Sequence, residues 1–421
     1  MAIVKRNIDW KVNRLTNALL AGNIQYSPFT KILLLYSLFT IHHSQSIAQS
    51  SIDSAVQQVE RNNKSIQSNN KFWEAKKTES KTGLTPYDPL VEYDYLFGSP
   101  VGAGNQKDFS ITQRLDFPTA YKRKKRLSTE QITQADFQQQ VYRQDVLLEA
   151  KLLSLKVIYL NKKSAELNRR LINTQKLVND YQVKLDKGDV IILDVNKAKL
   201  QLLNIKNEKE LNDNERQLIL TKITELNGGL PIAINDTIYP DLPVIPNFEI
   251  LDSIIEANDP ILKVYEQEKN ILQQEIALQK AMNLPKIETG YHSQGILGQS
   301  YRGIHAGITI PLWENKNKLK AFQSNLDYAF SNAETHRLNH QLENKQYYDQ
   351  LDVRFNMLQE YKNLLSTLNN TALLNKALAL GQITIIQYFY DERFYFTAYD
   401  EYLQSEWEYH QAVAKLFKFQ L

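Results

Sequence analysis

The sequence contains no cysteine. That absence excludes structural disulfides, thiolate metal sites, cysteine nucleophiles and lipidation of an N-terminal cysteine. Glycine and proline are also scarce, at 14 and 12 of 421 residues, and the stretch Leu127–Asn227 holds no proline and only Gly188. So few helix-breaking residues predict an elongated, mostly helical chain, although its length could hold two or three ordinary domains.

Other missing features exclude whole classes of function. The formal net charge is only +3, and basic residues form no block large enough to argue for nucleic acid. No Walker-type or dinucleotide glycine loop occurs, and no Ser-His-Asp grouping can be assembled. His336 and His340 have a spacing that suits a shared metal ion, but without a third ligand we interpret them as a solvated helix face. We expect no enzyme, cofactor or metal site.

The apolar run Ile32–Ile41 is too short to cross a bilayer as a helix, and no other stretch approaches the required length. It follows a basic residue and precedes small residues at Ser46 and Ala48, which is typical of a secretory signal cleaved after Ala48. We therefore expect residues 1–48 to form a signal peptide with a long N-terminal region. That region is either an extended basic segment or the result of a start codon placed too early. A buried N-terminal strand is the alternative.

The long stretch free of proline carries a coiled-coil seam. Apolar residues recur at alternating steps of four and three, a spacing of 3.5 that is typical of supercoiled helices. The rest of its surface is polar, so the helix must lie against other long helices, as it would also do in a cytosolic coiled coil. The seam runs through Val146, Ala150, Leu153, Val157, Leu160, Ser164, Leu167, Leu171, Thr174, Val178, Tyr181 and Leu185.

The chain repeats itself. At an offset of 196, Pro89, Glu92 and Tyr95 align with Pro285, Glu288 and Tyr291, and at an offset of 193, Gly188 aligns with Gly381. Each copy has a first helix, a pair of strands and a long helix broken at a glycine. The expected divisions are a first repeat at 51–227 (hairpin 90–117, long helix 120–227), an outside connector at 228–252, and a second repeat at 253–421 (hairpin 286–313, long helix 316–421).

Each strand pair alternates apolar and polar side chains, which predicts one apolar face and one polar face. The expected strands are 90–97 and 109–117, then 286–297 and 303–313. Four strands cannot close a barrel or cover their own edges, whereas strands of this length can cross an outer membrane. A small β-domain on a soluble helical stalk is the alternative. We expect Glu92, Asp94, Arg114 and Asp116 to face a watery lumen.

The export signal, the duplicated plan, the segments Asn258-Asp259-Pro260 and Leu284-Pro285, and the two glycines together resemble the TolC family of outer-membrane efflux proteins. The resemblance covers about Ser51 to Leu421. It implies a mostly α fold with a small β part: long coiled-coil hairpins form a trimeric α-barrel, and four strands per chain contribute to a shared twelve-stranded transmembrane β-barrel.

The resemblance also implies a function and partners. The protein would be a passive conduit from periplasm to exterior for small molecules or metal cations, seated in the lipid of the Gram-negative outer membrane and extending into the periplasm. Its partners would be two further copies of itself, a periplasmic adaptor and an inner-membrane pump, for which the RND class is the candidate. The alternatives are an exported periplasmic coiled-coil adaptor or scaffold without channel activity, and an enzyme on a helical stalk.

Finally, the resemblance implies a site at the two glycine-containing turns, Leu185–Val195 and Leu378–Tyr388. These would form the periplasmic tip, where the channel closes and the adaptor docks. Family members often carry acidic residues just after the second glycine. In this sequence Gln387 resembles the residue at that position. The candidate tip residues are Gly188, Asp189, Asp194, Gly381, Gln387 and Asp391.

Overall fold

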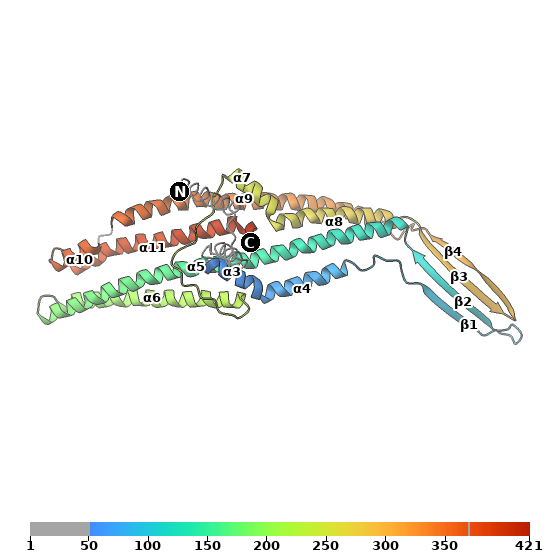
Figure 1. Ribbon diagram of the computed structural model, residues 1–421, viewed down its shortest axis with the longest axis horizontal. Coiled ribbons are helices and arrows are strands. Elements are labelled where there is room, and N and C mark those ends of the chain that lie inside the picture. The colour runs from blue at the N-terminus through green and yellow to red at the C-terminus, as the bar shows by residue number, and fades with distance from the viewer. Residues whose placement is uncertain (1–50, 369–370) are drawn as a thin grey trace, which may run out of the picture. The chain divides into compact units, whose positions relative to one another are not determined.

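The computed structural model describes residues 51–368 and 371–421 (Figure 1). The expected signal peptide lies outside the described residues. No helix in the described part of the chain is both long and apolar enough to cross a membrane.

The two halves of the chain have the same order of elements: helices, a strand pair, then long helices. The first half comprises α3 (Ser51–Asn62), α4 (Lys64–Glu79), β1 (Leu90–Leu96), β2 (Gln106–Leu115), α5 (Pro118–Asp186) and α6 (Ile192–Leu226). The second comprises α7 (Phe248–Asn258), α8 (Pro260–Met282), β3 (Lys286–Ile296), β4 (Gln299–Thr309), α9 (Lys318–Thr367), α10 (Thr371–Ala379), α11 (Ile385–Leu416) and the short 3-10 helix η1 (Lys418–Gln420).

The expected first helix of each half is two helices, because a capping residue interrupts it. The Asn63 side chain accepts a hydrogen bond from the backbone N–H of Ile66 at 2.8 Å and begins α4. The Asp259 side chain accepts one from Ile261 at 3.2 Å and begins α8, with proline at the first helical position. The two caps lie 196 residues apart, so the repeat seen in the sequence extends to helix boundaries.

The expected seam of α5 is buried or half-buried along its whole length, but the middle of the helix is buried on more than that stripe. Leu147, Leu155 and Ile158 lie off the seam and are at most 2% exposed. The reason is that α5 packs against α3, α4, α6, α8 and α11 together. A narrow seam is therefore the correct description only towards the end of the helix near Gly188.

The connector differs from the expectation in two respects. It ends earlier, because α7 begins at Phe248. It also does not simply lie along the outside: Ile232, Ile234 and Tyr239 are buried in the same core as α3 and the middle of α5. The Asn161 amide of α5 donates to the backbone carbonyl of Ile234 at 3.1 Å, which pairs a polar backbone group of this irregular segment.

The four strands form one antiparallel sheet in the order β1-β2-β3-β4, so strands of the two halves pair at its centre (Figure 1). Two of the expected strands, β2 and β4, have other bounds in the structure. β2 ends at Leu115 rather than at residue 117, and β4 runs from Gln299 to Thr309 rather than from 303 to 313. A two-residue turn at Leu297 and Gly298, with φ of 49° and 78°, replaces the longer loop. Proline at 311 lacks the N–H that a continued strand would need.

Candidate functional site

The sheet has two unlike faces, and the strand register assigns each residue to one of them. One face carries charged, polar and glycine residues, including Glu92, Asp94, Asp108, Arg114, Glu288, His292 and His305. The other carries large apolar and aromatic side chains that are 36% to 88% exposed in this chain: Val91, Tyr93, Tyr95, Phe109, Ile111, Ile287, Tyr291, Ile304 and Ile308. An apolar face of this extent requires an apolar surrounding or another protein surface.

Both edges of the sheet are open. Among the described residues, β1 pairs only with β2 and β4 pairs only with β3, so each outer strand presents unpaired backbone groups along one side. Such an edge is a template for pairing with another strand. Together, the exposed apolar face and the two open edges mean that the sheet of one chain is an incomplete structure.

The four residues expected in a lumen do not share one environment. Glu92 accepts a hydrogen bond from the Ser110 hydroxyl at 3.3 Å, and Arg114 donates to Glu288 of the neighbouring strand at 2.7 Å. Asp94 lies directly opposite Asp108 on the polar face. Asp116 follows the end of β2, is 2% exposed and pairs with Lys124 of α5 at 2.9 Å.

Asp116 therefore anchors the start of α5, and its position does not favour a lumen role. The lumen role of the other three residues remains a prediction.

The two glycine turns have the same hydrogen-bond pattern. Gly188 has φ of +81° and donates to Leu185 O at 2.9 Å, while the next residue donates to Lys184 O at 2.9 Å. Gly381 has φ of +70° and donates to Leu378 O at 3.2 Å, while the next residue donates to Ala377 O at 2.9 Å. This is the Schellman arrangement, which ends a helix with a residue in the left-handed conformation and favours glycine there.

The structure brings the two turns together. One apolar cluster joins the ends of α5, α6, α10 and α11 through Tyr181, Val195, Leu378, Ile385 and Tyr388. Both helical hairpins therefore end at the same place, as the sequence resemblance implies.

The acidic and amide residues of the turns have differing partners. Asp189 and Asp391 are exposed, and Asp194 pairs with Lys197 one turn later at 3.1 Å. Gln387 forms a capping box with Thr384: its backbone N–H donates to the threonine hydroxyl at 3.2 Å, and its side chain accepts from the Thr384 N–H at 3.0 Å. The position of Gln387 thus has a local explanation in starting α11, and its role in a gate remains a prediction.

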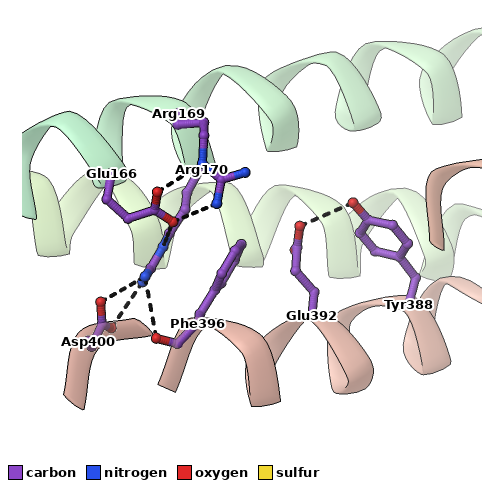
Figure 2. Close-up of polar contacts among 7 residues, drawn as sticks. All are labelled: Glu166, Arg169, Arg170, Tyr388, Glu392, Phe396 and Asp400. Carbon is purple, nitrogen blue, oxygen red and sulfur yellow. Dashed lines mark hydrogen bonds and ion pairs between the residues drawn. The ribbon is translucent and has the colours of Figure 1, made fainter. Parts of the chain in front are cut away.

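A buried polar cluster between α5 and α11, which the sequence did not predict, lies further along these helices (Figure 2). The Arg170 side chain is 3% exposed and donates to both carboxylate oxygens of Asp400, at 2.7 and 3.0 Å, and to Glu166 at 2.9 Å. Its guanidinium carbon lies 4.1 Å from the centre of the Phe396 ring. Arg169 makes a second pair with Glu166 at 2.7 Å. The cluster ties the first repeat to the second.

Glu392 lies beside this cluster, and no cation among the described residues forms an ion pair with it. It is 3% exposed, and it accepts a hydrogen bond from the Tyr388 hydroxyl at 3.1 Å. Burial raises the pKa of the Glu392 carboxyl, against the opposing effects of the Tyr388 hydrogen bond and of Arg169 and Arg170. Burial also raises the pKa of Tyr388. A buried carboxyl of this kind favours its protonated form.

The histidine pair is not a solvated helix face, contrary to the sequence interpretation. His340 is 8% exposed and lies 3.1 Å from Asp259, the residue that caps α8, while its other ring nitrogen lies 3.1 Å from the Asn344 amide. His336 stacks on Tyr265 at 4.1 Å. Within residues 51–368 and 371–421, no group of three His, Cys, Asp or Glu residues could hold a metal ion.

Comparison with known proteins links this geometry to a class of fold. No protein-family model matches the chain, and no curated protein sequence resembles it significantly. Solved structures do match. A membrane protein from Pseudomonas aeruginosa has a TM-score of 0.75 at 14% identity, covering 88% of this chain and 92% of its own. CusC, described as forming a transmembrane channel, has a TM-score of 0.74 at 13% identity, covering 88% of this chain and 91% of its own. The outer-membrane channel OprN has a TM-score of 0.71 at 14% identity, covering 88% of this chain and 89% of its own.

The fold is thus that of outer-membrane channel proteins. It is the fold of the TolC-like efflux channels, and the sequence resemblance is confirmed at the level of the fold.

Proposed function

We propose that the protein is the outer-membrane channel of a tripartite efflux system, acting as a passive conduit from the periplasm to the exterior. The observation that carries the proposal is the incomplete sheet, with an exposed apolar face, a polar opposite face and two open edges. Three chains would supply three such four-stranded sheets and close a single barrel without edges, with lipid outside and water inside.

The helices support the same assembly. α6 exposes leucines that no other part of the described chain covers, namely Leu200, Leu203, Leu211 and Leu218 at 51% to 70% exposure. In a homotrimer these side chains can pack against a neighbouring copy and continue the α-barrel. The proposed location is the Gram-negative outer membrane, with the helices extending into the periplasm.

The proposed gate is the cluster of glycine turns. Packing between the helix ends and polar contacts near Asp189, Asp194, Gln387 and Asp391 would hold the tip closed. A periplasmic adaptor and an inner-membrane pump, for which the RND class is the candidate, would open it. Opening requires that these partners bind the dilated tip more tightly than the closed one, because equal affinity shifts no equilibrium. The proposed cargo is small molecules or metal cations.

A disulfide cross-linking experiment tests the assembly. The chain has no cysteine, and β1 and β4 are separated by two strands, so cysteines on these two edges are too far apart to bond within one chain. Tyr93→Cys combined in turn with Arg302→Cys, Ile304→Cys or Ala306→Cys should give a ladder ending at a trimer in at least one pairing. The pair Ile111→Cys and Tyr291→Cys, which are direct neighbours within the sheet, should give no ladder.

The experiment is done on outer membranes before and after detergent extraction. A trimer that requires detergent supports the channel. A soluble monomer or dimer, with no ladder from any edge pair, overturns the channel and favours the periplasmic coiled-coil adaptor or scaffold.

A further inference from the structure

Basic residues without acidic partners surround the point where the helices meet the sheet. Five consecutive basic residues, from Lys122 to Arg126, lie in the second turn of α5, just after β2. Within the described chain only Lys124 of these has an ionic partner, Asp116. At the corresponding place in the second half, three exposed lysines lie at or just before the start of α9. We call the unpaired set the basic collar: Lys122, Arg123, Lys125, Arg126, Lys316, Lys318 and Lys320.

The collar is unfavourable for an isolated chain. Lys122 and Arg126 are four apart on one helix, and like charges at that spacing repel. Cations near the start of a helix also oppose its dipole, and neither α5 nor α9 has an acidic residue in its first turn. The same arrangement occurs in both repeats, so it belongs to the shared plan of the molecule rather than to one segment.

The chain next to the collar has the composition of a membrane interface. Trp313, between β4 and α9, is 80% exposed, and Leu312 beside it is 66% exposed. Tyr87, just before β1, is 56% exposed, and its ring lies 5.9 Å from the Lys124 ammonium. Aromatic side chains with an apolar body and a polar end gather where hydrocarbon gives way to headgroups. From the strands towards the long helices, the apolar sheet face is therefore followed by aromatic residues and then by unpaired cations.

We propose that the basic collar is a docking surface for anionic phospholipid headgroups. It would bind the phosphates of the leaflet that adjoins the helix end of the sheet. The inference rests on the proposed function, because it requires the sheet to lie in a membrane. Headgroup phosphates would offset the repulsion within the collar and fix the depth and tilt of the sheet. They would also place the long helices in a defined direction.

The test uses the purified trimer in bilayers of phosphatidylcholine mixed with brominated lipid. Bromine quenches the fluorescence of a nearby tryptophan. The difference in fluorescence between the wild type and Trp313→Phe is the signal of Trp313, and its quenching reports contact with the brominated lipid. We expect brominated phosphatidylglycerol to quench Trp313 at about fivefold lower mole fraction than brominated phosphatidylcholine at low salt, with the difference shrinking as salt rises.

Matched variants separate the collar from overall charge. The triple variants Lys122→Gln/Lys125→Gln/Arg126→Gln and Lys316→Gln/Lys318→Gln/Lys320→Gln should each reduce the preference at least about twofold, and together abolish it. A variant with the same charge loss at exposed, unpaired lysines elsewhere, Lys176→Gln/Lys206→Gln/Lys222→Gln, should keep it. Exchanging the collar lysines for arginine should also keep the preference for phosphatidylglycerol. The mass of the trimer verifies that each variant assembles.

The outcomes distinguish this inference from the proposed function. If neither lipid quenches Trp313 above the Trp313→Phe background, the sheet does not lie in the bilayer, and the proposed function fails along with the collar. If both lipids quench equally, only the collar is overturned. The collar is also overturned if its substitution leaves the preference intact, or if the control variant loses it to the same extent.

Discussion

Removing Arg170 should loosen α11 from α5. In Arg170→Met the new side chain can still lie on the Phe396 ring, but Asp400 and Glu166 lose their shared cation. Breaking a buried ion pair costs about 3–5 kcal/mol. Here the lower end applies, because Glu166 keeps Arg169 at 2.7 Å and Asp400 is 37% exposed and can hydrate. About 3 kcal/mol corresponds to a roughly 150-fold change in a local opening equilibrium.

Hydrogen exchange read by mass spectrometry measures this directly, since backbone amides exchange through local opening. Peptides covering 392–404 of α11 should exchange roughly 150-fold faster in Arg170→Met, while peptides of the sheet should not change. The control is Arg337→Met, which breaks the exposed pair with Glu256 and should change exchange in α9 less than about fivefold. A change below tenfold at α11, or an equal effect in the control, would refute the idea that Arg170 couples the two repeats.

Three further predictions concern protonation and backbone. The raised pKa of Glu392 means that the wild type loses stability as pH rises above the ordinary carboxyl value of 4.5, so Glu392→Gln should unfold at a higher temperature than wild type at pH 8 and show a flatter pH profile. Burial and nearby Lys162 lower the pKa of His410 to about 4, so stability should fall between about pH 6.5 and 4 by roughly 3 kcal/mol. His410→Phe should remove that part of the acid dependence in urea titrations while keeping the stack on Tyr239. At Gly188 the positive φ is the constraint and a Cβ meets no atom within 4 Å. On the proposed function, Gly188→Asn should therefore assemble and bind the adaptor nearly as wild type, whereas Gly188→Val should impair both.

Local patterns explain what the sequence could predict. Alternation at period two assigned Glu92 and Tyr93 to opposite faces of a strand before any pairing was known, and the register places them so. The glycine turns were equally readable, because a lone glycine in a long helical stretch marks a left-handed residue. The start of β4 could not be predicted, because it depends on Leu297 taking a positive φ, which a leucine rarely does.

Contacts between distant residues could not be predicted. The basic residues of α5 are visible in the sequence, but the sequence does not show whether acidic side chains lie close enough to pair with them. Arg170 and Asp400 are separated by 230 residues, and each alone resembles an ordinary charge on a helix surface. The interpretation of His340 as part of a solvated helix face was wrong for the same reason, because its partner Asp259 lies 81 residues away. The pattern of residues along the chain predicts which face of a helix or strand is buried, whereas the residue that packs against that face is known only from the structure.

The two parts of the described chain depend on assembly to different degrees. The helices possess buried cores of their own, built by α3, α5, α6 and the connector and by α7, α9 and α11. The sheet has none, because its apolar side chains remain exposed and its edges unpaired. The helical part can therefore be largely ordered in a single chain, while the strands gain most of their stability on meeting other strands and lipid. On the proposed function, association of three chains and insertion of the sheet are therefore one step.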